Sequence, residues 1–148
     1  MTNNRVDIVL RAMSEVEQIF SRLVQLIPTF KVLDKTLVPE GLKPHTRSIC
    51  WLMEQVILQN TKLNGAKWGL KDFEYPPSDI SVWDAKFRLI RVPEAEYTFV
   101  NVKVSNATKP ARKNDMGSVK ALLNFYESEH DPILLCVIFM FRFSNVQI

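Results

Sequence analysis

The stretch Tyr97-Thr98-Phe99-Val100-Asn101-Val102-Lys103-Val104 decides the fold, because it reads as a strand whose two faces differ. With a period of two residues, Thr98 and the three valines fall on one face, and Asn101 and Lys103 fall on the other. A lysine on a strand that is otherwise buried is costly unless it has a partner or a function. We therefore predict a functional site on the polar face of this strand.

Two further strand-like runs precede this stretch, at Trp68–Glu74 and Ile80–Ile90. The prolines Pro76-Pro77 separate these two runs, and a short turn-prone segment around Pro93 separates the second run from the third. Short connections of this kind predict antiparallel neighbours. The polar face of the middle run, which we interpret as solvated, holds Asp84, Lys86 and Arg88.

Helical periodicity frames these strands on both sides. Apolar residues recur at spacings of three and four over residues 5–27, about 44–60 and roughly 115–128. The run 133–143 is almost entirely apolar, which predicts a central strand covered on both faces. We expect one domain over residues 1–148, with an N-terminal helix and connection over 1–43 and a core over 44–148.

Composition excludes several classes of protein. Hydrophobic residues make up 47% of the chain and charged residues 24%, which is typical of a globular protein. No apolar run is long enough to span a membrane, no signal segment is evident, and we expect a cytoplasmic location. The four glycines form no phosphate-binding loop, so we expect no nucleotide cofactor. Cys50 and Cys136 lie in apolar stretches without a CxxC partner and are interpreted as buried free thiols.

Positive charge is concentrated in one segment of the chain. Residues 101–120 carry five cations against the single acid Asp115, a local net charge of +4, whereas the whole chain carries +3. A localised basic segment on a nearly neutral domain indicates contact with a polyanion. The alternative interpretation is a solvated loop rich in lysine.

The order of these elements and two short motifs resemble the PD-(D/E)xK nuclease superfamily. The motifs are Ser78-Asp79 at the head of the second strand and Asn101-Val102-Lys103 on the third. Within the superfamily the chain looks most like a small type II restriction endonuclease, and the resemblance covers roughly residues 44–143. It implies a three-layer α/β/α core, in the order helix, three antiparallel strands, helix and strand, with an extra N-terminal helix.

The resemblance also implies the roles of the site residues. Asp79 and the residue at position 101 would bind Mg²⁺, and Lys103 would orient or activate the attacking water. A hard cation prefers carboxylate and phosphate oxygens, which suits this assignment. Glu54, on the helix before the strands, is the candidate for an auxiliary carboxylate; its alternative interpretation is a surface glutamate.

Asn101 departs from the family pattern, because an acid is expected at this position. Three explanations compete. An engineered substitution of the acid is one, and a carboxylate supplied from elsewhere in the chain is the second. The third is a nuclease-like domain that binds without cleaving.

The implied substrate is double-stranded DNA, cut at a specific site by a homodimer. The segment that follows the third strand supplies the expected DNA contacts, namely Ser105, Asn106, Lys109, Arg112, Lys113 and Asn114. The long N-terminal helix is the candidate dimerisation element, and the alternative is simple packing on the sheet. Two other functions fit the same pattern: a non-catalytic module that binds nucleic acid or protein, and a nuclease specific for branched or damaged DNA.

Overall fold

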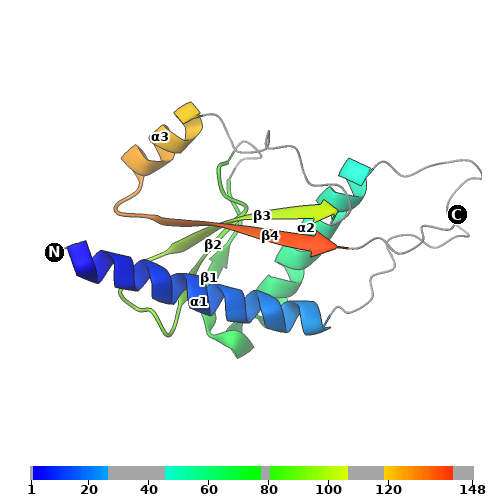
Figure 1. Cartoon of the computed structure of the whole chain (residues 1–148), viewed down its shortest axis with the longest axis horizontal. Coiled ribbons are helices and arrows are strands. Elements are labelled where there is room, and N and C mark those ends of the chain that lie inside the picture. Colours follow the sequence, from blue (N-terminus) through cyan, green and yellow to red (C-terminus); the bar gives the residue numbers. More distant parts are fainter. Residues whose placement is uncertain (1, 27–45, 78–80, 107–118, 142–148) are drawn as a thin grey trace, which may run out of the picture.

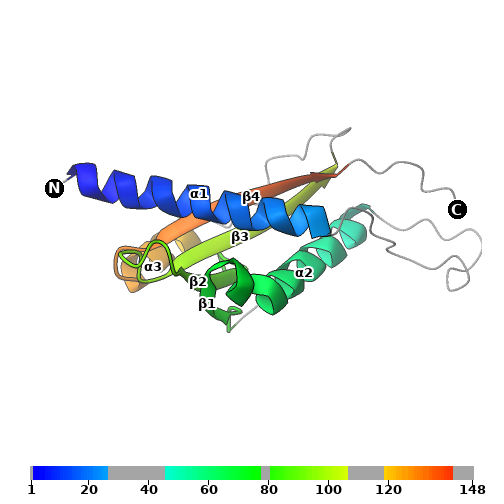
Figure 2. The same ribbon diagram turned by 90° about the horizontal axis from the view of Figure 1, so that it is seen from below.

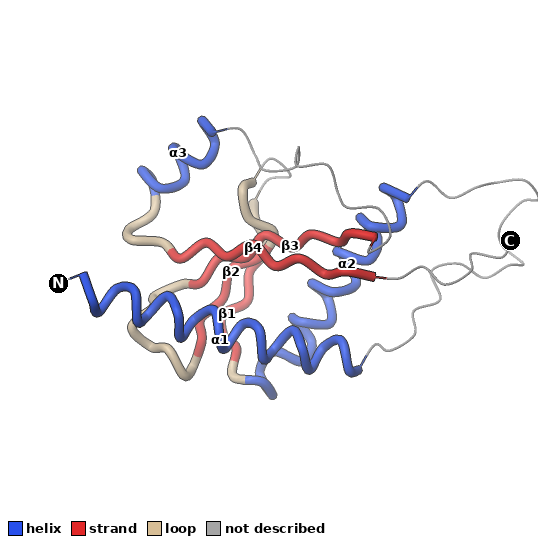
Figure 3. The backbone as a smooth tube through the Cα atoms, viewed as in Figure 1, coloured by secondary structure: helices blue, strands red, loops and turns tan. Residues whose placement is uncertain are grey.

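The computed structural model describes residues 2–26, 46–77, 81–106 and 119–141. Figures 1 and 3 show the arrangement of the helices and strands. In chain order, the elements are α1 (Thr2–Leu26), α2 (Thr46–Asn64), the 3-10 helix η2 (Gly65–Trp68), β1 (Leu70–Glu74), β2 (Ala85–Leu89), β3 (Thr98–Asn106), α3 (Val119–Ser128) and β4 (Ile133–Phe141).

The strands form one mixed sheet in the order β1-β2-β3-β4. β1 pairs antiparallel with β2, β2 pairs antiparallel with β3, and β4 pairs parallel with β3. The predicted α/β class and the three antiparallel strands are therefore confirmed. Among the described residues, no helix is long and apolar enough to cross a membrane.

The two faces of the sheet are covered differently. The helical face carries Val100, Val102 and Val104 of β3, which are buried in one cluster with residues of α1 and α2. The opposite face, called the site face below, carries Phe99, Asn101 and Lys103 of β3. Phe125 of α3 packs on Phe99 in a separate small cluster, with the ring centroids 4.9 Å apart. The predicted apolar face of this strand is thus confirmed, whereas the face with Asn101 and Lys103 is polar only beyond Phe99.

β4 lies at the edge of the sheet, so its prediction as a central strand covered on both faces is wrong. Its register with β3 places Cys136 beside Asn101 and Ile138 beside Lys103 on the site face. Ile138 is 62% exposed and Met140 is 66% exposed. The sequence of an all-apolar strand does not indicate whether a neighbouring strand lies beside it, and for this reason β4 was predicted to be central.

α1 runs along β4 in the same direction, as Figures 1 and 2 show. Near the start of β4, Arg5 forms a 3.0 Å ion pair with Asp131. Near its end, Phe20 packs edge-on against Phe139, with ring centroids 5.3 Å apart. The first helix of the chain therefore covers the last strand.

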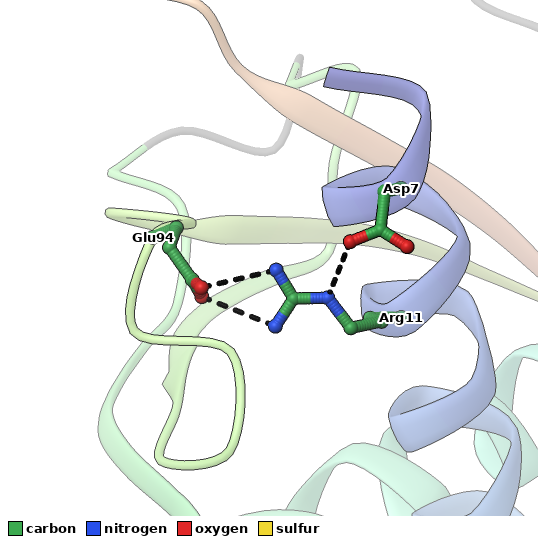
Figure 4. Close-up of polar contacts among 3 residues, drawn as sticks. All are labelled: Asp7, Arg11 and Glu94. Carbon is green, nitrogen blue, oxygen red and sulfur yellow. Dashed lines mark hydrogen bonds and ion pairs between the residues drawn. The ribbon is translucent and has the colours of Figure 1, made fainter. Parts of the chain in front are cut away.

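Two ion pairs fix the rotation of α1 about its own axis. Arg11 donates to both carboxylate oxygens of Glu94 and also to Asp7, one turn earlier in the helix (Figure 4). Glu15 lies 3.5 Å from a guanidinium nitrogen of Arg91. Because Arg91 and Glu94 lie in the connection between β2 and β3, this flank of α1 faces that connection.

Candidate functional site

The site lies where the pairing of β2 with β3 stops and β3 extends further without a partner strand on that side. β2 pairs with β3 only as far as Ala85 opposite Val100, whereas β3 extends to Asn106. Beyond that point, backbone N–H groups on the β2 side of β3 need other acceptors, because unpaired buried N–H groups are costly. Two carboxylates supply them. Asp84 Oδ2 accepts from Val102 N at 2.7 Å, and Glu54 Oε1 accepts from Val104 N at 3.0 Å.

These bonds place two acids side by side along one strand edge. The nitrogens of Val102 and Val104 are two residues apart, which corresponds to about 7 Å along a strand. Lys103 lies between them in the chain, on the site face, and it is half-buried. Asn101 is also half-buried, and its Nδ2 donates to the carbonyl of Val82 at 3.0 Å. Two carboxylates thus lie along this edge of β3, and Asn101 and Lys103 lie on the site face of the same stretch.

Asp84 is the site residue that the sequence prediction missed. The predicted acid at the head of the second strand, Asp79, lies outside the described residues. The strand itself begins at Ala85, not at Ile80, so the acid directly before it is Asp84. Its N–H donates to Val100 O at 2.8 Å, which holds its side chain beside β3. Asp84 is half-buried and hydrogen bonded, and the interpretation of its side chain as solvated is therefore wrong.

Glu54 reaches the same edge from α2. Its carboxylate is half-buried and bonded to β3, so the alternative of a surface glutamate is wrong. Burial raises the pKa of the nearby Cys50 thiol, and the negative charge of Glu54 raises it further. Both cysteines are free, as expected, but Cys50 is only half-buried and Cys136 is exposed, so the prediction of burial is wrong for Cys136.

Lys86 and Arg88 continue the site face along β2. Lys86 pairs with Glu74 at 3.1 Å and Arg88 with Asp72 at 3.5 Å, and both cations stack over the ring of Tyr97. These two cations are therefore held by partners within the sheet. Lys103 differs, because no carboxylate of the described residues forms an ion pair with it.

The expected DNA-contact segment is described only at its start. Ser105 is half-buried on the site face, two residues beyond Lys103. Asn106 is the last residue of β3. The predictions for Lys109, Arg112, Lys113 and Asn114 lie outside the described residues.

The side-chain oxygens at the site are of the kind that binds a hard cation. A carboxylate has several lone-pair positions, so accepting one N–H leaves Asp84 capacity for another partner. Asn101 donates through its nitrogen, which leaves its Oδ1 as an acceptor. In the described parts of the chain, no group of three or more His, Cys, Asp or Glu side chains is placed to hold a metal ion together. A metal here would therefore rely on Asp84, the Asn101 amide oxygen and further oxygens.

No protein-family model matches this chain, and no curated protein is significantly similar to it.

Proposed function

We propose that the protein is a Mg²⁺-dependent endonuclease that hydrolyses phosphodiester bonds of double-stranded DNA at specific sites. One observation carries the proposal. Asp84 and Glu54 accept hydrogen bonds from the N–H groups of Val102 and Val104 on the same edge of β3, and Lys103 lies between these two valines in the chain. Carboxylates with a neighbouring ammonium group suit a reaction in which a phosphate bears extra negative charge in its transition state.

The fold is compatible with this activity. The order α2, β1, β2, β3, α3, β4, with β4 parallel to β3, agrees with the core expected for a restriction-endonuclease-like protein. In that comparison Asp84 takes the role first assigned to Asp79, because it directly precedes β2 and contacts β3.

Each residue has a distinct role in the proposal. Asp84 and the Oδ1 of Asn101 would hold the metal, with Glu54 as the auxiliary carboxylate. Bound Mg²⁺ would polarise the phosphoryl group and acidify a water molecule. The ammonium group of Lys103 would orient that water and stabilise negative charge on the phosphate. Ser105 lies on the same face and would contact the DNA backbone.

A second function is favoured by one feature of the site. Asn101 is neutral, and Asp84 and Glu54 are each engaged with the backbone of β3. Carboxylates in these positions also serve a purely structural purpose, as substitutes for a missing strand. The alternative is therefore a nuclease-like module that binds nucleic acid or protein without cleaving it.

The test compares the protein and an Asn101→Asp variant on plasmid DNA with Mg²⁺. Cleavage by both would support an enzyme whose other carboxylates complete the site, and cleavage by the variant alone would indicate a disabled metal site. No cleavage by either on several plasmids would contradict the proposal and favour the binding module.

The same variant also tests metal binding directly. Asn101 donates to Val82 O, and an aspartate cannot donate to that carbonyl. The Asn101→Asp variant should therefore unfold more easily than the parent in EDTA, and Mg²⁺ should recover part of the loss. Equal thermal unfolding midpoints of the variant with Mg²⁺ and with EDTA would argue against a metal at this position.

A further inference from the structure

An exposed tryptophan of α2 lies beside the candidate site. Trp51 is 61% exposed, whereas the other two tryptophans, Trp68 and Trp83, are half-buried and buried. Glu54 follows Trp51 by three residues, and side chains at this spacing are neighbours on the surface of a helix. Because Glu54 accepts from Val104 N, the exposed indole is next to the carboxylate that supports the free edge of β3.

Polar side chains continue from Trp51 along the same flank of α2. Gln55, Gln59 and Lys62 are exposed and, at about 100° per residue, lie within about 80° of Trp51 round the helix. From Trp51 to Lys62 the flank extends roughly 16 Å along the helix axis. It therefore leads away from the site toward the C-terminal end of α2.

Tyr75, which directly follows β1, adds a second aromatic ring to this flank and is 40% exposed. Its hydroxyl donates to Gln59 Oε1 at 3.0 Å, and Nζ of Lys62 lies 4.9 Å from the centroid of its ring. Gln59 is eight residues from Trp51, which is about 12 Å along the helix. The surface formed by Trp51, Gln55, Gln59, Lys62 and Tyr75 is called the α2 strip below.

The charge around the α2 strip is positive. Between Gln55 and Lys71 the chain has three lysines and no acid. All three lysines are exposed, namely Lys62, Lys67 and Lys71. The acids on either side of this stretch are Glu54, which is bonded to β3, and Asp72, which is paired with Arg88. The α2 strip therefore suits an anionic partner.

Aromatic rings combined with cations are the means by which proteins hold single strands of nucleic acid, because bases stack on the rings and phosphates attract the cations. We infer that the α2 strip binds an unpaired stretch of a nucleic acid strand that leads away from the site. In a duplex, by contrast, each base is stacked on its neighbours and has no free face for a side chain. At about 3.4 Å per stacked nucleotide, the 12 Å between the two aromatic positions spans about three or four nucleotides.

The choice of DNA as the strand rests on the proposed function. If the protein cleaves DNA, the α2 strip narrows its substrate to a duplex that carries an unpaired stretch beside the cleaved phosphodiester. Binding to the strip needs no cleavage, so the two proposals can be tested separately.

The test measures how tightly the full chain binds a fluorescein-labelled oligothymidylate in EDTA, by fluorescence anisotropy. The parent should bind, and Trp51→Ala should raise the dissociation constant on the order of 10-fold, as expected for one lost base–aromatic stack. Tyr75→Ala should act in the same direction, whereas Tyr75→Phe keeps the ring and should bind nearly as the parent does. The matched control is Tyr126→Ala, which removes an exposed ring from α3 and should leave binding unchanged.

Intrinsic fluorescence shows whether the indole of Trp51 itself contacts the bases. The oligothymidylate should quench the tryptophan emission of the parent. Trp51→Phe retains a ring for stacking and should still bind, but its emission should not be quenched, because Trp68 and Trp83 are half-buried and buried.

The salt dependence of binding tests the cationic part of the α2 strip. Lys62→Gln should lower the slope of log K against log salt by about 0.7, the value for one phosphate contact on a single strand. Arg22→Gln, which removes an exposed cation from α1, is the control and should leave the slope unchanged.

Two results would overturn the inference. The first is a parent that does not bind the oligothymidylate, or Trp51→Ala and Tyr75→Ala variants that bind it as tightly as the parent does. The second is equally tight binding of polyglutamate that Trp51→Ala weakens to the same extent, which would assign the α2 strip to an acidic protein partner. Strand binding without cleavage of any DNA would keep the inference and reject the proposed function, whereas cleavage without strand binding would do the reverse.

Discussion

The carboxylate of Asp84 accepts a 2.7 Å hydrogen bond from the backbone N–H of Val102, at the point where β2 stops and β3 continues. This bond supports the free edge of β3, and the carboxylate that accepts it is also part of the candidate site. In the proposed function, the same carboxylate that completes the hydrogen bonding of β3 is also a ligand of the cation. Substitutions that keep the shape of the side chain and remove its charge can separate these two roles.

The first prediction concerns Asp84→Asn. The amide oxygen can still accept from Val102 N, so the free energy of unfolding should fall by only about 1 kcal/mol, the difference between a charged and a neutral hydrogen bond. Plasmid cleavage should fall on the order of 100-fold, because the variant lacks the negative charge that would hold the cation beside the reacting phosphate. Asp72→Asn, which removes an exposed carboxylate on β1, is the control and should cleave normally. Unchanged cleavage by Asp84→Asn would assign Asp84 a structural role only.

The second prediction separates charge from hydrogen bonding at Glu54. Glu54→Gln keeps an acceptor for Val104 N, whereas Glu54→Ala leaves that N–H without this partner. Urea unfolding should show a loss of about 1–3 kcal/mol for the alanine variant and a smaller loss for the glutamine variant. If Glu54 also acts electrostatically, both variants should lose cleavage. Full activity of Glu54→Gln would limit its role to support of β3.

The third prediction is that Lys103→Met removes activity without loss of stability. Lys103 is half-buried and forms no ion pair with a carboxylate of the described residues, and burying an unpaired charge is unfavourable, so the methionine variant should unfold at the same or higher urea concentration. Cleavage should fall on the order of 100-fold, because the stabilising ammonium group is gone. Lys86→Met is the matched control, since Lys86 is half-buried on the same face but already paired with Glu74. An equal loss of cleavage in both variants would point to a general effect of surface charge.

The fourth prediction concerns the pH dependence of stability at the α1 contact. Hydrogen bonds from Arg11 hold the pKa of Glu94 below its usual value. Because the pKa of Glu94 is lower in the folded state, its contact with Arg11 contributes fully to stability above the unfolded-state pKa, about 4.3. This contribution is lost as the pH falls through the folded-state pKa of Glu94. The difference in thermal midpoint between the parent and Glu94→Gln should therefore shrink on acidification below about pH 4. A difference that persists at pH 2.5 would show that the charge of Glu94 is not its source.

The fifth prediction concerns the two thiols. Cys136 is exposed on β4, whereas the pKa of Cys50 is raised by burial and by the charge of Glu54. The thiolate is the reactive form, so a water-soluble maleimide should label Cys50 much more slowly than an exposed cysteine. In the Glu54→Gln variant the pKa of Cys50 should fall and its labelling should speed up. Peptide mass spectrometry over a time course measures both rates, and an unchanged rate at Cys50 would contradict the coupling.

Most of the fold could be predicted from the sequence, because helices and strands differ in the period of their apolar residues. The alternation around Val100 and Val102 gave the correct faces of β3, and Asn101 and Lys103 share a face as expected. The place of β4 could not be predicted in this way. Its composition reports how apolar the strand is, and not whether a neighbour lies beside it.

The site was harder to predict, because it depends on where one strand starts. β2 starts five residues later than predicted, so the acid that directly precedes it is Asp84, whereas Asp79 lies outside the described residues. The bond from Val104 to Glu54 joins residues from α2 and β3, and no local pattern encodes it. The sequence did indicate the type of residue in this contact, namely a carboxylate on the helix that precedes the strands.

The contact between Arg5 and Asp131 has a consequence for how the chain is made. These residues are 126 positions apart, and α1 covers the last strand of the sheet. At about 5–20 residues per second, a ribosome needs on the order of 6–25 s to extend the chain between them. Throughout that time the first helix has emerged while the strand that it covers does not yet exist. Until β4 has been made, the apolar residues of α1 that pack on it in the folded protein lack that surface.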